Sequence, residues 1–147
     1  MRQRWIATLI GLTTLLVPFV FAPAANAGGQ PIVVTLTGAA ERPGPGDPDG
    51  SGTAVLTFNR GLGEVCWFIS VSDITLPATA AHIHIAPETD PGPIVVGLSA
   101  PGADGIASGC ATADRDLVKD IAKNPQDYYV NVHTTDFPAG ALRSQLG

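Results

Sequence analysis

Turn-forming residues divide this chain into short segments, and their spacing restricts the fold more than any other feature. The chain contains 17 Gly and 13 Pro among 147 residues, and the apolar runs between them have the length of strands. Such a series is typical of an all-β sandwich or barrel, and we predict an antiparallel β-sandwich. The predicted strands are residues 32–36, 53–58, 65–74, 81–85, 94–98, 128–134 and 142–146.

One segment departs from the β pattern. Apolar residues recur at helical spacing between residues 112 and 124, with acidic residues early and lysines late. Asn124 and Pro125 then end the pattern. We therefore predict one short amphipathic helix that lies on the sandwich.

The first residues have the pattern of an export signal. Arg2 and Arg4 precede a mostly apolar stretch, and Ala25-Asn26-Ala27 offers the small residues that signal peptidase recognises. The alternative is an uncleaved membrane anchor, but the uninterrupted apolar part is short for a span. We predict a cleavable signal peptide at residues 1–27 and one secreted, extracytoplasmic domain at residues 28–147, with no membrane span after cleavage.

The mature domain is acidic. Without the signal it keeps six of the eight basic residues and all 13 acidic ones, a net charge of −7. Proteins that bind nucleic acid need clustered Lys and Arg, so this charge excludes nucleic acid as the expected partner.

Two cysteines, Cys66 and Cys110, lie in the mature domain. An oxidising compartment favours a disulfide between them, which stabilises the folded state by about 4 kcal/mol in the chain-entropy model. Metal-binding or nucleophilic cysteines are the alternative, although the pair lacks CxxC spacing.

All three histidines of the chain fall within predicted strands. His82 and His84 lie two residues apart, which places both on one face of a strand, about 6.6 Å apart. If the strand of His133 is a neighbour, three imidazoles converge, the ligand number of a catalytic zinc or a copper site. The alternative is that His82 and His84 form hydrogen bonds across strands to Asn131, Thr134 or a backbone carbonyl.

Five motifs occur in an order that resembles the CHRD domain, first described in the developmental antagonist chordin and also found in secreted microbial proteins. They cover nearly the whole mature chain. One departure is Ala141, which stands where family members commonly carry an acidic residue, whereas Arg143 and Gln145 match. The motifs are TGAAERP at residues 37–43, TAAHIH at 79–84, PGPIV at 91–95, YVNVHT at 129–134 and PAGALRSQL at 138–146.

The resemblance implies an extracellular, non-catalytic binding or structural module whose partner is an unknown extracellular protein or surface ligand. The residues agree, since no catalytic motif such as GxSxG stands out. The alternative function is a copper- or zinc-binding protein that uses His82, His84 and His133, with a layout similar to copper-zinc superoxide dismutases. Arg143 would then steer an anion toward the metal. The alternative is a structural role, in which Arg143 pairs with Asp136, Glu64 or a carbonyl, or stacks on Tyr129.

Overall fold

The computed structural model describes residues 29–147, so the predicted signal peptide lies outside the described residues. Every predicted strand is present, with ends that differ by no more than two residues. The strands are β1 (Ile32–Thr37), β2 (Ser51–Asn59), β3 (Glu64–Ser72), β4 (Ala80–Ile85), β5 (Ile94–Leu98), β6 (Ile106–Thr112), β7 (Tyr128–His133) and β8 (Leu142–Gln145). The helices are α1 (Arg115–Lys123) and two short 3-10 turns, η1 (Gly38–Ala40) and η2 (Pro125–Asp127).

Strand β6 is the one that the sequence pattern missed. Its residues are mostly Ala, Ser, Gly and Thr, which have little of the β-branched and aromatic character that marks a strand. Only Ala107 is buried. Its pairing with β3, rather than its own composition, makes it a strand.

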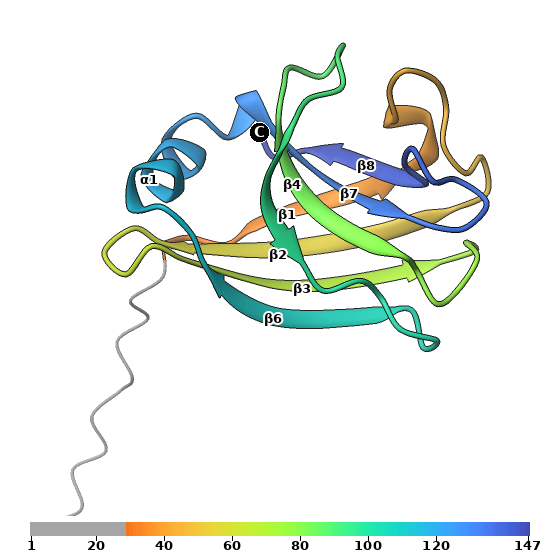
Figure 1. Cartoon of the computed structure of the whole chain (residues 1–147), viewed down its shortest axis with the longest axis horizontal. Coiled ribbons are helices and arrows are strands. Elements are labelled where there is room, and N and C mark those ends of the chain that lie inside the picture. Colours follow the sequence, from red (N-terminus) through yellow and green to blue (C-terminus); the bar gives the residue numbers. More distant parts are fainter. Residues whose placement is uncertain (1–28) are drawn as a thin grey trace, which may run out of the picture.

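The eight strands form one antiparallel sheet in the order β5-β4-β7-β8-β1-β2-β3-β6. Figure 1 shows β1, β2, β3 and β6 side by side, with β4 and β7 crossing in front of them, so the sheet is strongly curved. The edge strands β5 and β6 come into contact, and the sheet is nearly closed. The all-β antiparallel class is confirmed, while the division into two sandwich layers stays a prediction.

A serine links the two edges of the sheet. Trp67 on β3 donates its indole N–H to Ser99 Oγ at 2.9 Å, just beyond the end of β5. Ser99 Oγ donates in turn to the backbone carbonyl of Ser108 on β6, at 3.3 Å. A buried indole N–H needs such a partner, and here the partner also joins the edges.

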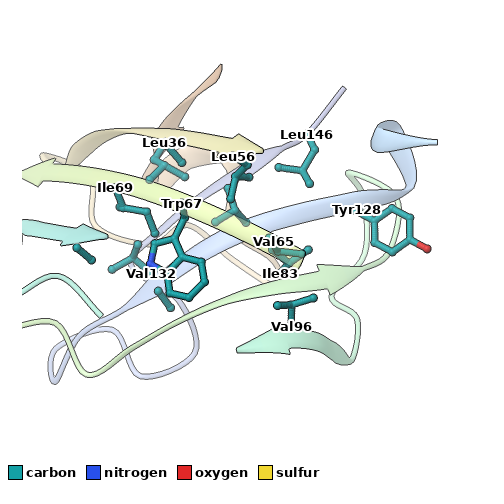
Figure 2. Packing of buried hydrophobic residues seen from close by; sticks show 14 of the residues in the cluster. Leu36, Leu56, Val65, Trp67, Ile69, Ile83, Val96, Tyr128, Val132 and Leu146 are labelled. Carbon is teal, nitrogen blue, oxygen red and sulfur yellow. The ribbon is translucent and has the colours of Figure 1, made fainter. Parts of the chain in front are cut away.

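The core fills the inside of the curved sheet. Strand β3 shows the predicted alternation, because Val65, Trp67, Ile69 and Val71 are all buried. Figure 2 shows Val65, Trp67 and Ile69 packed with residues from the opposite wall, such as Ile83 on β4 and Val132 on β7. Residues from the other strands, such as Leu36, Leu56 and Val96, complete the cluster.

Helix α1 packs on the β2 and β3 part of the sheet through Val118 and Ile121, both fully buried. Its first turn is capped by Asp114, whose carboxylate accepts hydrogen bonds from the backbone N–H groups of Asp116 and Leu117. The predicted amphipathic helix is thus confirmed. Neither it nor the 3-10 turns within residues 29–147 has the length and apolar character needed to cross a membrane.

The predicted disulfide is present. Cys66 on β3 and Cys110 on β6 are directly opposite each other in the register, and their sulfur atoms are bonded. The cysteine side chains lie on the outer face of the sheet, opposite Trp67 and Ile69. The bond therefore fastens the edge strand β6 from outside the core.

Candidate metal centre

The candidate centre lies on the outer face of β4 and β7. These strands are antiparallel neighbours, with Ala80 opposite His133, His82 opposite Asn131, and His84 opposite Tyr129. Strand alternation sends Ile83 of β4 into the core and leaves the histidines on the other face. The three histidines that the sequence singled out are brought together, with one ring nitrogen of each lying within 4.8 Å of the others.

The closest pair of ring nitrogens already has the separation of two metal ligands. Nδ1 of His82 and Nε2 of His133 lie 3.3 Å apart. Two nitrogens bound about 2.0 Å from one tetrahedral ion are roughly 3.3 Å apart. His84 completes the set if its nitrogen moves in by no more than about 1.5 Å, the difference between 4.8 Å and that spacing.

Backbone carbonyls orient two of the rings. Nδ1 of His84 donates to the carbonyl of Gly92 at 2.8 Å, and Nδ1 of His133 donates to that of Pro138 at 3.1 Å. Because a carbonyl oxygen only accepts, the proton of each neutral ring is on Nδ1 and the lone pair is on Nε2. Metal-ligating histidines commonly use their second nitrogen in this way.

The protonation states also suit metal binding. Burial lowers the pKa of His82, and the neighbouring His133 and His84 lower it further. Burial likewise lowers the pKa of His84 and of His133, although the hydrogen bonds to Gly92 and Pro138 offset part of the effect. Neutral imidazole is the form that coordinates a metal ion, so less proton competition is expected at pH 7.

A stack of three side chains holds His84 in place. The His84 ring lies parallel to that of Tyr129, with a centroid separation of 4.6 Å and an interplanar angle of 6°. The guanidinium of Arg143 lies 3.5 Å from the centroid of the Tyr129 ring. Such cation–π and stacking contacts restrain all three groups.

Arg143 also fastens the loop between β4 and β5 over this face. It is 1% exposed and donates to the carbonyls of Pro87 and Asp90, each at 3.0 Å. These contacts, with the stack on Tyr129, match the structural alternative for Arg143, with carbonyls in place of Asp136 or Glu64. Its role in steering an anion stays a prediction.

Glu41 is a buried acid, close to Arg143 and Asn131, that the sequence analysis did not select. It is 3% exposed, its carboxylate packs closely against Gly140, and Oε1 has no hydrogen-bond partner among the described residues. Burial raises the pKa of Glu41 to about 7, although the Arg143 charge and a hydrogen bond from the Asn131 side chain act against that rise. The sequence did offer one signal for this residue, because Glu41 is the single acidic residue of the motif at residues 37–43.

A second group of potential ligands, formed by Glu64, Cys66 and Cys110, is of a different kind. Both of its sulfurs are used by the disulfide, so this group offers no thiolate. The alternative of metal-binding or nucleophilic cysteines is therefore wrong.

A comparison with protein-family models matches residues 32–146 to the family described as the CHRD domain. The chain belongs to the CHRD family. No curated protein and no solved structure matches it. In this CHRD domain the matched region contains all three histidines, the disulfide, Glu41 and Arg143, so every part of the candidate centre lies within it.

Proposed function

We propose that this CHRD domain is a secreted, non-catalytic binding module that holds one copper or zinc ion between His82, His84 and His133. The observation that carries the proposal is the convergence of three ring nitrogens within 4.8 Å, two of them on rings oriented by backbone carbonyls. Imidazole suits both metals, and three histidines are a common ligand set for them.

Several features support binding rather than catalysis. Arg143 and Tyr129, which stack beside His84, are occupied in holding the loop at Pro87–Gly92. We also propose that the curved sheet has a sandwich layout similar to that of copper-zinc superoxide dismutases. An extracytoplasmic location is supported by the predicted signal peptide and by the disulfide, which persists in oxidising compartments.

Isothermal titration of the purified secreted protein with Zn²⁺ and Cu²⁺ tests the proposal. We expect one ion per chain, with an affinity at least about 100-fold weaker in the His82→Ala/His84→Ala variant, because two ligands are lost. Asp49→Ala is the matched control, since it removes an exposed carboxylate that is not among the potential ligands of the centre. Binding that is micromolar or weaker and unchanged in the histidine variant would refute the metal site.

A further inference from the structure

Asn131 lies on the same face of the sheet as the three histidines, and the proposed function assigns it no role. It is 2% exposed and stands directly opposite His82 in the β4–β7 register. Its Oδ1 lies 3.1 Å from Nε2 of His84. Asn131 therefore contacts His84 on the face of the sheet that carries the three histidines.

The hydrogen atoms around this contact can be assigned from its neighbours. The Gly92 carbonyl takes the Nδ1 proton of His84, so the neutral ring presents a lone pair at Nε2. In the structure the amide oxygen of Asn131, and not its NH₂ group, faces this lone pair.

Two acceptors thus face each other at 3.1 Å with no hydrogen between them. Such an arrangement is unfavourable by itself, but a cation placed between the lone pairs makes both contacts attractive. The separation is also close to the roughly 3.3 Å expected for two ligands of one tetrahedral ion. His84 cannot easily turn away, because Tyr129 covers its ring and Gly92 holds its other nitrogen.

We propose that Oδ1 of Asn131 is the fourth ligand of the metal ion. This inference rests on the proposed function. Three imidazole nitrogens and one amide oxygen make a closed, four-coordinate site, which is the form of metal sites that bind without catalysing. The hard oxygen ligand selects a divalent ion, Zn²⁺ or Cu²⁺, over Cu⁺.

Titration with Co²⁺ as a spectroscopic probe tests the fourth ligand, because tetrahedral Co²⁺ absorbs strongly in the visible range and its bands depend on the ligand set. We expect Asn131→Ala to weaken Co²⁺ and Zn²⁺ binding by about 10- to 100-fold and to shift the visible bands. Ser144→Ala, a change on the adjacent strand β8, is the control and should leave both unchanged.

Asn131→Asp separates a ligand from a merely structural residue. A carboxylate that coordinates the ion should bind Co²⁺ more tightly than the amide does, whereas a structural role would weaken binding because the new charge lies beside Glu41. Thermal melts of the metal-free variants establish that each is folded. Bands and affinities that are the same in Asn131→Ala and the unmodified protein would overturn the fourth ligand and leave the histidine site standing. Absence of metal binding in the unmodified protein would instead overturn the proposed function, and this inference with it.

Discussion

Removal of the Cys66–Cys110 disulfide tests how the edge of the sheet is held. The bond closes a loop of 44 residues, for which the chain-entropy model gives a stabilisation of about 4 kcal/mol. A domain of about 119 residues has an unfolding entropy of roughly 0.25 kcal/mol/K, so we expect the melting temperature to fall by about 15 °C.

The structure also predicts where the effect is largest. Strand β6 pairs only with β3 and buries only Ala107, so few apolar contacts hold it once the disulfide is gone. We therefore expect the amide hydrogens of β6 to exchange faster in the reduced protein, while those of the interior strands β1 and β8 stay protected.

Differential scanning calorimetry with and without a reductant measures the change, and the Cys66→Ser/Cys110→Ser variant provides the same comparison without a reducing agent. A thiol assay on the denatured protein establishes that reduction is complete. A melting temperature that moves by less than about 3 °C on complete reduction would contradict the entropy argument, as would uniform exchange across the sheet.

Three further predictions concern stability. Because the pKa of Glu41 is about 7 when folded and 4.5 ordinarily, the folded state holds its proton more tightly. Glu41 should therefore lower the free energy of unfolding by about 3 kcal/mol as the pH rises from 4.5 through 7. Urea titrations at several pH values should show that this loss disappears in Glu41→Gln but persists in the exposed control Glu88→Gln. Leu56→Ala should cost about 3 kcal/mol in urea titrations because its side chain is fully buried, whereas the exposed Leu62→Ala should cost under about 0.5 kcal/mol. Asp114→Ala should cost about 1 kcal/mol through loss of the helix cap, and an unchanged urea midpoint would rule that out.

Local periodicity explains why most of the fold could be predicted. In β3 the alternation of Val65, Trp67 and Ile69 with polar or smaller residues indicated both the strand and its buried face, because successive side chains point to opposite sides. Strand β6 was missed because its identity depends on pairing with β3 across more than 30 residues of chain. Composition carries no signal of such a non-local contact.

In the candidate centre, too, some features follow from local sequence periodicity and others only from contacts between distant segments. The sequence by itself determined that His82 and His84 share one face of a strand, since a period of two residues is a local property. It did not determine that β4 and β7 are neighbours, which brings His133 to the other two histidines. The burial of Glu41 and the placement of Asn131 against His84 were also decided only by the tertiary structure. Loops and strands far apart in the sequence create those environments, and no pattern within either segment encodes the distance between them.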